Sequence, residues 1–418
     1  MRTAIIWRKL LGVDPDTVIE HLEMQGGALL AHVRPRQRVR LRCPHCEQIC
    51  PRYDQGGGER RWRTLDLGTV MAFLVGPATR VRCPEHGVVV AAVAWARHGA
   101  RFTRAFDDQV AWLANGASKS TVCELMRISW RTVGRIISRV SAEFDEEATF
   151  DRLRRIGIDE ISHRKGQRYL VVVTDHDTKK VVWAAPGRSK ETVETFFDRL
   201  GPERCARIEV VTADGASWIR GPVMARCPEA KLCLDPFHVV QWATDALDSV
   251  RRETWNAARR AGQKAVADEL KGARFALWKN PEDLTANQKR RLADIRKSNR
   301  GLYLAYLLKE QLRRVFRLDA ERALRLLDHW LRWARRSRLK PFVKLAETIT
   351  RWKEELRASL RLRASNGLAE SVNTRIRLIL RRAFGFHTAE AAIALVMLGL
   401  GGRCPSLPGE RSVSLPWR

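Results

Sequence analysis

The sequence predicts a multidomain α+β protein with a β-rich, zinc-binding module at its N-terminus, then a helix-turn-helix, then an α/β catalytic core interrupted by an α-helical insertion. Three observations predict this order. Two metal-ligand pairs are flanked by strand patterns, three short amphipathic helix patterns follow them, and strand and helix patterns then alternate as βββαβαβ. At 418 residues, with 45% apolar residues, the chain is long enough to bury several cores.

Composition indicates a polyanion as the partner. The chain has 76 Lys and Arg against 47 Asp and Glu, a net charge of +29, which favours nucleic acid over the rival candidate, a membrane surface. The longest apolar stretches, near 88–95 and 391–401, are shorter than a spanning helix requires, and the short run AIIW ends at Arg8 and Lys9, so neither a membrane span nor an export signal is predicted. Nine cysteines, an odd number, suit a metal site in a reducing cytoplasm.

Residues 1–40 are expected to form a small lead-in module. The patterns VIEHLEMQ and ALLAHVR are separated by Gly26 and Gly27, and two glycines between alternating strands are typical of a β-hairpin turn.

Residues 41–99 are predicted to form a zinc finger. A C-x-x-C pair and a C-x-x-H pair stand about 40 residues apart, joined by strand patterns such as TLDLGTVMAFLV, which is the arrangement of a tetrahedral structural zinc site. The predicted ligands are Cys43, Cys46, Cys83 and His86. His45 and Cys50 are near enough in sequence to leave a different ligand set open.

Residues 100–148 predict a helix-turn-helix. Ser118 or Ser120 is expected to cap the middle helix and Ser129 the last one. The residues that begin this last helix would then read DNA, and we expect contacts from Arg131, Thr132 and Arg135. An ordinary three-helix linker is the alternative.

Beyond Asp151 the pattern has the element order of an RNase H-like core. Asp159 lies in the first strand, Asp214 ends the fourth, and Glu370 lies in the first turn of a basic amphipathic helix. The last two acids are 156 positions apart, so an insertion is expected between them. The predicted segments are the first part of the core at 151–239, the insertion at 240–364, the catalytic and C-terminal helices of the core at 365–403, and a tail at 404–418.

The three acids predict a catalytic metal site. Packed carboxylates repel one another and raise their own pKa values, so such a cluster is expected where divalent cations neutralise it. Mg²⁺ or Mn²⁺ suits oxygen ligands, and two such ions perform phosphodiester chemistry. The triad alone is not specific in a chain with 47 acidic residues; the order of elements around it supports the prediction.

The insertion is predicted to be mostly helical, and its sequence is rich in Arg and Trp. Its dense basic runs favour contact with the DNA backbone, although a solvated surface is the usual role of such charges. These runs are Lys289, Arg290, Arg291, and Arg335, Arg336, Arg338.

With these parts in order, the chain resembles the DDE transposases of bacterial insertion sequences, in the lineage with an N-terminal zinc finger, a helix-turn-helix and an interrupted RNase H-like core. The resemblance covers nearly the full length and is most specific in GIDEISHRKGQRYLVVVTDHD, LDPFHVVQWATDALDSVRR and SNGLAESVNTRIR. It implies that Asp159, Asp214 and Glu370 are the catalytic acids. The chain departs from the family pattern at two positions. Gly215 stands where a larger residue is common, and His86 stands where Cys is common.

Further site residues follow from the same resemblance and from helix geometry. LDPFH resembles the aspartate-x-x-histidine motif after the second acid, which implies that Asp235 and His238 hold or orient the scissile DNA; a core histidine is the alternative for His238. Phosphate contacts are expected from Arg164 and Lys165, unless they form only a solvated turn, and, on the helix of Glu370, from Asn373, Arg377 and Arg381.

The resemblance implies an enzyme that recognises the terminal inverted repeats of its element, hydrolyses a phosphodiester there, and joins the freed 3′-hydroxyl to target DNA. Double-stranded DNA is then the partner, at least a dimer works on paired ends, and the bacterial cytoplasm, at the nucleoid, is the location. Two alternatives stay open: an RNase H-like nuclease that cuts without joining, and a DNA-binding regulator derived from a transposase.

Overall fold

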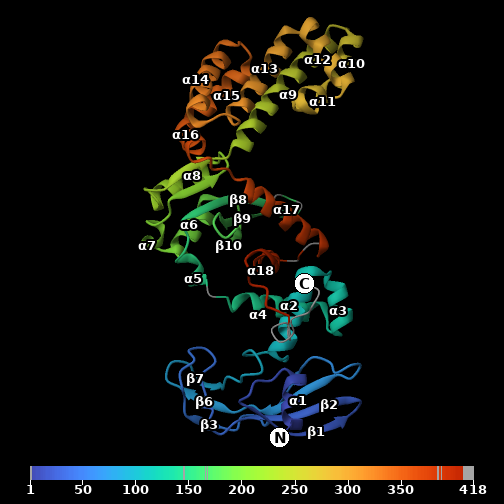
Figure 1. The fold of residues 1–418 in the computed structure, drawn as a ribbon, viewed down its shortest axis with the longest axis vertical. Coiled ribbons are helices and arrows are strands. Elements are labelled where there is room, and N and C mark those ends of the chain that lie inside the picture. The colour runs from blue at the N-terminus through green and yellow to red at the C-terminus, as the bar shows by residue number, and fades with distance from the viewer. Residues whose placement is uncertain are drawn as a thin grey trace. The chain divides into compact units, whose positions relative to one another are not determined.

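A computed structural model describes residues 2–144, 146–164, 166, 168–383, 386 and 388–407 (Figure 1). The chain forms two compact units. One comprises Met1–Phe144 and Arg382–Arg418, and the other comprises Asp145–Arg381. Each is described by itself.

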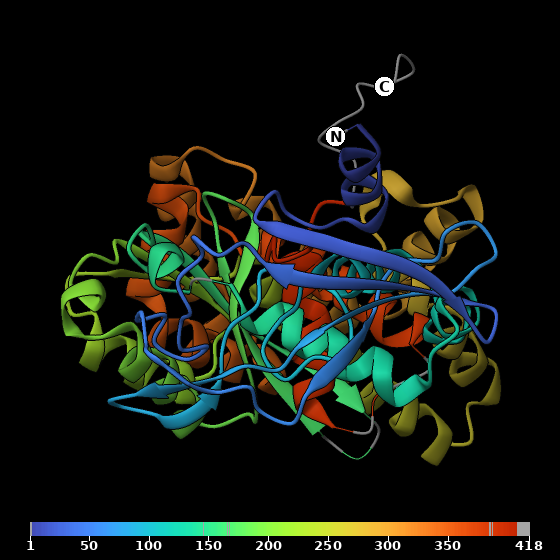
Figure 2. The same cartoon turned by 90° about the horizontal axis from the view of Figure 1, so that it is seen from below.

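The first unit begins with α1 (Arg2–Leu11), a helix that the sequence analysis did not predict, which packs Leu11 into the core of a four-stranded sheet. The sheet has the order β1-β2-β5-β4. Its strands are β1 (Thr17–Gln25), β2 (Ala28–Pro35), β4 (Glu59–Arg63) and β5 (Ala72–Pro77). The predicted hairpin is confirmed: Gly26 and Gly27 both have positive φ, as a two-residue turn between twisted strands requires. Its strands are the long blue arrows in the foreground of Figure 2.

This sheet joins two segments that the sequence analysis kept apart. β5, from the expected zinc-finger segment 41–99, pairs in parallel with β2, from the expected lead-in 1–40. The strand expected over TLDLGTVMAFLV is shorter than its pattern, because Gly68, at φ +62°, lies in a turn bridged by Leu67 and Val70. A separate three-stranded sheet has the order β3-β6-β7, formed by β3 (Arg52–Asp54), β6 (Arg80–Cys83) and β7 (Gly87–Val90).

The helix-turn-helix consists of α2 (Arg104–Gly116), α3 (Lys119–Met126) and α4 (Trp130–Ala142). Ser118 caps α3 and Ser129 caps α4, each accepting a backbone N–H bond three residues on. α18 (Ala389–Leu400), expected in the catalytic core, packs instead against α4 and α2. It is almost wholly apolar, and this contact buries Leu395, Val396 and Leu398.

The second unit is built on a five-stranded sheet of order β10-β9-β8-β11-β12, in which β8 runs antiparallel to β9 and parallel to β11. Along the chain, three strands and then two strands alternating with helices give the βββαβαβ element order predicted for an RNase H-like core. The strands are β8 (Arg155–Arg164), β9 (Arg168–Asp175), β10 (Lys180–Pro186), β11 (Val210–Ala213) and β12 (Lys231–Leu234). The run LVVV of β9 is buried on both faces, as the central strands of a covered sheet require.

Helices of the core lie beside this sheet. α5 and α6 pack against β10, and α8 packs against both α6 and β12. The core helices are α5 (Glu146–Phe150), α6 (Lys190–Leu200), α7 (Pro202–Cys205), α8 (Ser217–Arg226) and α17 (Gly367–Arg382).

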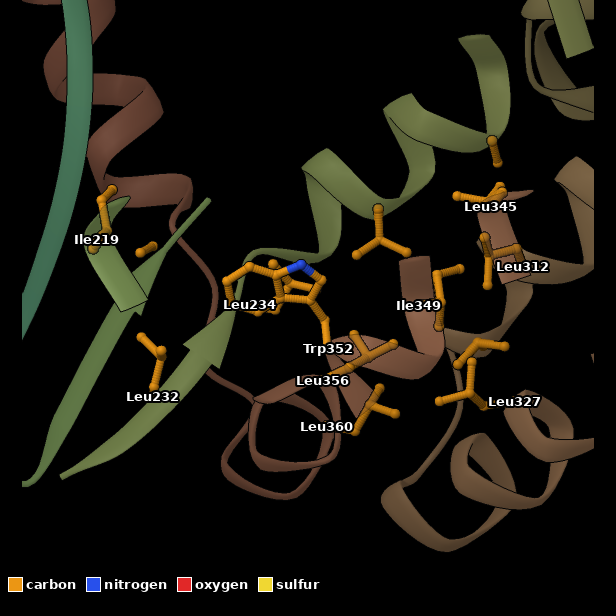
Figure 3. Packing of buried hydrophobic residues seen from close by; sticks show 14 of the residues in the cluster. Ile219, Leu232, Leu234, Leu312, Leu327, Leu345, Ile349, Trp352, Leu356 and Leu360 are labelled. Atoms are coloured by element: carbon orange, nitrogen blue, oxygen red, sulfur yellow. The ribbon is translucent and has the colours of Figure 1, made fainter. Parts of the chain in front are cut away.

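The predicted insertion is helical throughout and forms the yellow-to-orange group in Figure 1. Its elements are α9 (Pro236–Arg260), α10 (Lys264–Gly272), α11 (Arg274–Trp278), the 3-10 turn η1 (Pro281–Asp283), α12 (Ala286–Ser298), α13 (Arg300–Val315), α14 (Ala320–Arg336), α15 (Lys340–Arg351) and α16 (Lys353–Leu362). α16 packs on β12, so one apolar core continues from the sheet into the insertion. Figure 3 shows Trp352, Leu356 and Leu360 in the same apolar cluster as Leu234 and Ile349.

Candidate active site and metal ligands

The two predicted zinc-ligand pairs come together beside the three-stranded sheet. The sulfur atoms of Cys43, Cys46 and Cys83 and a ring nitrogen of His86 all lie within 4.8 Å of one another. Cys43 Sγ is 3.7 Å from His86 Nδ1, and Cys46 Sγ is 3.6 Å from Cys83 Sγ. Three thiols and one imidazole at these separations fit the tetrahedral coordination of structural Zn²⁺.

His45 and Cys50, which the sequence left open as ligands, are outside this set. The His45 ring stacks on His86, with centroids 5.0 Å apart, and meets His98 edge-on. The Cys50 thiol donates to the Gln48 carbonyl at 3.4 Å. His86 is therefore the fourth ligand in this geometry.

In the second unit, the sheet places two of the predicted acids side by side. Asp159 lies in β8, and Asp214 directly follows β11, the parallel neighbour of β8. Ala213 is in register with Ile158, so the two acids take equivalent positions on adjacent strands. Asp159 is only 8% exposed, and Asp214 Oδ1 is buried with no hydrogen-bond partner among the described residues.

Burial changes the titration of both carboxyls. Loss of solvent raises the pKa of Asp159 to about 6; a hydrogen bond from the Glu160 backbone opposes this rise and the charge of Asp214 adds to it. Loss of solvent also raises the pKa of Asp214. Two adjacent, poorly solvated carboxylates, one with an unpartnered oxygen, fit a divalent cation with oxygen ligands.

The third predicted acid, Glu370, lies on α17, and residues on either side of it bond this helix to the sheet. Asn373 donates from Nδ2 to Asp159 Oδ2 at 2.9 Å. Asn366, just before the helix, accepts from Thr212 Oγ1 at 2.8 Å. Glu370 lies between them and is exposed. Among the described residues, the carboxylates of the triad do not form a group as tight as the zinc set.

Asp235 and His238 form a hydrogen-bonded pair at the start of α9. Asp235 is buried, caps α9 at the Phe237 N–H, and also accepts the backbone N–H of Asn366 at 3.1 Å. Its other oxygen lies 3.0 Å from His238 Nδ1. This hydrogen bond raises the pKa of His238, against the effect of burial, and the charge of nearby Asp214 raises it further.

The predicted DNA-contacting residues are mostly accessible. Arg131 and Arg135 are exposed on α4, whereas the Thr132 hydroxyl is engaged with Ser129 at 2.9 Å. Arg164 is exposed at the end of β8, and Lys165 lies outside the described residues. On α17, Arg377 and Arg381 are exposed, and Asn373 is buried against Asp159. The six basic residues noted in the insertion are all exposed.

Two residues that the sequence analysis missed shape the site. Asn366 is 2% exposed, and its side chain contacts Thr212, 154 positions earlier, a long-range contact that leaves no sequence pattern. Gly157 lies beneath it: a Cβ there would lie 2.9 Å from Asn366 Oδ1 and 2.8 Å from Thr174 Oγ1. The glycine therefore makes room for the asparagine. The sequence SNG before a helix is a recognisable N-terminal signal, but it does not reveal this contact.

Gly215, noted as a departure from the family pattern, has a steric explanation. A Cβ at this position would lie 2.3 Å and 2.5 Å from two ring carbons of Trp242 on α9. The glycine lets the indole pack directly behind the strand end that carries Asp214.

The fold and the paired acids define a DDE-type, RNase H-like enzyme, and sequence comparisons agree. The family described as "Transposase" (DDE_Tnp_ISL3) matches residues 156–396, the helix-turn-helix domain of transposase family ISL3 matches 91–141, and the zinc-finger of transposase IS204/IS1001/IS1096/IS1165 matches 40–86. The chain belongs to the ISL3 family of DDE transposases. Cys43, Cys46, Cys83 and His86 thus form its zinc-ribbon site.

Two similar proteins are named transposases. The chain is 51% identical over 438 residues to the transposase for insertion sequence element IS1557 of Mycobacterium tuberculosis, strains CDC 1551 / Oshkosh and ATCC 25618 / H37Rv, covering 99% of both chains. It is 26% identical over 375 residues to the transposase for IS1001 of Bordetella parapertussis, covering 89% of this chain and 91% of that one. The chain is therefore an insertion-sequence transposase, and its helix-turn-helix implies DNA binding. Among the described residues, no helix is long and apolar enough to cross a membrane.

Proposed function

We propose that this transposase binds the terminal inverted repeats of its element, hydrolyses a phosphodiester at each end, and joins the freed 3′-hydroxyl to target DNA. The observation that supports the proposal is the pair Asp159 and Asp214, side by side on adjacent strands, with Asp159 buried and Asp214 Oδ1 buried without a partner among the described residues. With Glu370 they would hold Mg²⁺ or Mn²⁺. Such ions activate the attacking oxygen and stabilise charge on the phosphate.

The phase of α17 supports Glu370 as the third ligand. Asn366 and Asn373 both bond to groups of the sheet edge, and they stand four positions before and three positions after Glu370. Residues at these spacings share one side of a helix. Glu370 therefore faces the edge that carries Asp159, and its exposure leaves the carboxylate free to turn toward a bound cation.

In this proposal Asn366 is a positioning residue. Its backbone carbonyl accepts the Glu370 N–H at 3.1 Å, its side chain holds Thr212 beside Asp214, and its own N–H is held by Asp235. It thus fixes the first turn of α17 relative to both strands.

His238 and Asp235 would orient the scissile DNA. Asp235 occupies Nδ1 of the imidazole, which leaves Nε2 for the substrate. The raised pKa of His238 favours the protonated ring, which attracts phosphate.

Recognition of the DNA ends would fall to the first unit, through the zinc ribbon and the N-terminal residues of α4. The exposed basic runs of the insertion, together with Arg164, Arg377 and Arg381, would contact the DNA backbone. Paired ends require at least a dimer in the working complex.

To test this proposal, the purified chain is incubated in the presence of Mg²⁺ with DNA that carries the repeats flanking its gene. We expect cleaved ends and products joined to target DNA. Cleavage without joining would replace the proposal with a nuclease, and binding without cleavage would replace it with a regulator. Asn366→Ala should bind the DNA normally but require about 10–100-fold more Mg²⁺, the usual effect of losing a residue that supports metal ligands.

A further inference from the structure

A second cluster of metal-ligating side chains lies on the β1–β2 hairpin, away from the zinc ribbon. His21 and His32 are directly opposite each other across the two strands. Their rings are stacked, with centroids 4.0 Å apart and planes 12° apart. Two imidazoles held face to face in this way place their nitrogens close together on one surface.

A carboxylate completes the cluster. Glu23 follows His21 by two positions in β1, and its Oε1 lies 3.3 Å from His32 Nε2. Ligand atoms of His21, Glu23 and His32 all lie within 4.8 Å of one another. From β4, Glu59 approaches the other nitrogen of His32, with Oε1 at 3.5 Å from Nδ1.

The face of the sheet that carries this cluster is the one opposite to its apolar core. Ala31 and Val33, the neighbours of His32 in β2, are buried in that core, and side chains alternate along a strand. His32 is 16% exposed, whereas Glu23 is 48% exposed. The cluster is therefore open on one side, and a solute ion can reach it.

We propose that His21, His32 and Glu23 bind a divalent transition-metal ion of the class that prefers imidazole, such as Zn²⁺. Two histidines and one glutamate are a known zinc-ligand set that leaves one position open, here for water. Glu59 would not bind the ion but would accept a hydrogen bond from the Nδ1–H of His32, because metal-bound histidines usually donate their second ring N–H to a carboxylate.

Neither carboxylate neighbour holds the His32 ring by a short hydrogen bond. Both carboxylate contacts of His32, at 3.3 Å and 3.5 Å, are longer than the roughly 2.7–2.9 Å of a charge-assisted hydrogen bond. The lone pairs of stacked imidazoles point in parallel directions, so tetrahedral coordination needs side-chain rotations that tilt the two rings apart and aim all three ligand atoms at one point. The proposal is independent of the proposed catalytic function.

The test uses the full chain with its ribbon zinc retained, and Ni²⁺ as the probe, because Ni²⁺ also favours imidazole. Equilibrium dialysis against micromolar Ni²⁺, followed by elemental analysis, should give one Ni²⁺ per wild-type chain. His21→Asn and His32→Asn should each abolish Ni²⁺ binding and leave the zinc content unchanged. Glu59→Gln should weaken it by about 10–100-fold.

The matched control is His329→Asn, which removes an exposed histidine from α14. It should bind Ni²⁺ as the wild type does. The proposal is overturned if wild type binds no Ni²⁺ below millimolar concentration, or if the His21 and His32 variants bind as much as wild type. Circular dichroism of each variant separates a lost site from a lost fold.

Discussion

The zinc ribbon and the proposed catalytic metal site differ in how completely the structure assembles them. The four zinc ligands lie within 4.8 Å of one another, on two tight loops. At the acidic site, Asp159 is buried and hydrogen-bonded, Asp214 is half-buried, and Glu370 is exposed one helical turn from the asparagines that anchor its helix. The first site is set by local spacing; the second depends on contacts such as that between Asn373 and Asp159, 214 positions apart.

This difference reflects what each metal does. Structural zinc contributes folding energy, so its ligands are held as part of the fold. A catalytic cation must accept substrate oxygens, and its carboxylates repel one another when it is absent. Loss of a zinc ligand should therefore unfold the ribbon. Loss of a proposed catalytic carboxylate should instead abolish activity and stabilise the folded state.

The largest effect is expected from Cys83→Ser. Removing one thiolate from a site whose zinc is worth on the order of 10 kcal/mol should release the metal and unfold the ribbon. Elemental analysis and hydrogen exchange across β3, β6 and β7 measure both outcomes. Cys404→Ser, which changes a cysteine outside the site, should leave zinc bound. If β3, β6 and β7 stay protected from hydrogen exchange after the zinc is lost, the zinc does not hold the ribbon folded, and the contrast with the acidic site is wrong.

Next in size is the loss of DNA binding in a variant carrying Arg131→Ala and Arg135→Ala. These exposed residues at the start of α4 should contribute roughly 1–3 kcal/mol each and steepen the salt dependence of binding. Binding titrations at two salt concentrations test this, with Arg152→Ala, an exposed arginine of the second unit, as control. Equal affinity of the wild type and the double variant would show that α4 is not the recognition helix.

A smaller effect, a gain in folding stability instead of a loss, is expected from Asp159→Asn. The folded pKa of about 6 lies above the usual value of 3.8, so the wild type loses stability as pH rises between these values. At pH 7 without metal, the variant should therefore be more stable by roughly 2–3 kcal/mol, and the gain should vanish below about pH 4. Urea unfolding with and without Mg²⁺ measures it.

Mg²⁺ should stabilise the wild type and not this variant. Asp268→Asn, at an exposed acid of α10, is the control. Its stability without metal and its stabilisation by Mg²⁺ should both equal those of the wild type. An Asp159→Asn protein less stable than wild type at pH 7 would show that the carboxylate serves the fold.

The smallest effect is expected from Gly215→Ala. Its Cβ would overlap the Trp242 ring, and overpacking of this size costs about 1–2 kcal/mol. Thermal unfolding measures the loss, which Trp242→Phe should partly restore. Gly221→Ala, at a helical glycine with no atom within 4 Å of the new Cβ, is the control and should be neutral or slightly stabilising. Equal stability of both alanine variants would mean that the indole moves freely.

The sequence predicted features governed by neighbouring residues. Gly26 and Gly27 identify the hairpin turn, Ser118 and Ser129 identify helix starts, and ligand spacing identifies the zinc site. The βββαβαβ element order of the second unit was also predicted, because each strand and helix has its own hydrophobic pattern.

Features set by distant partners were not predictable in this way. The pairing of β5 with β2 and the packing of α18 on α4 depend on which apolar faces meet, and periodicity does not specify that. Nothing local reveals that Asn366 reaches Thr212 or that Trp242 needs a glycine at position 215. The placement of Glu370 is a long-range feature of the same kind.

The most direct measurement is single-turnover cleavage and joining of the element's ends, with Mg²⁺, by Asp159→Asn, Asp214→Asn and Glu370→Gln. Asp245→Asn, at an exposed acid of α9, is the control and should react as wild type does. We expect all three variants to bind the ends with wild-type affinity and to cleave at least about 10³-fold more slowly, since each removes a ligand of the reacting metal. Near wild-type cleavage by any one of them would contradict a metal site built from these three acids.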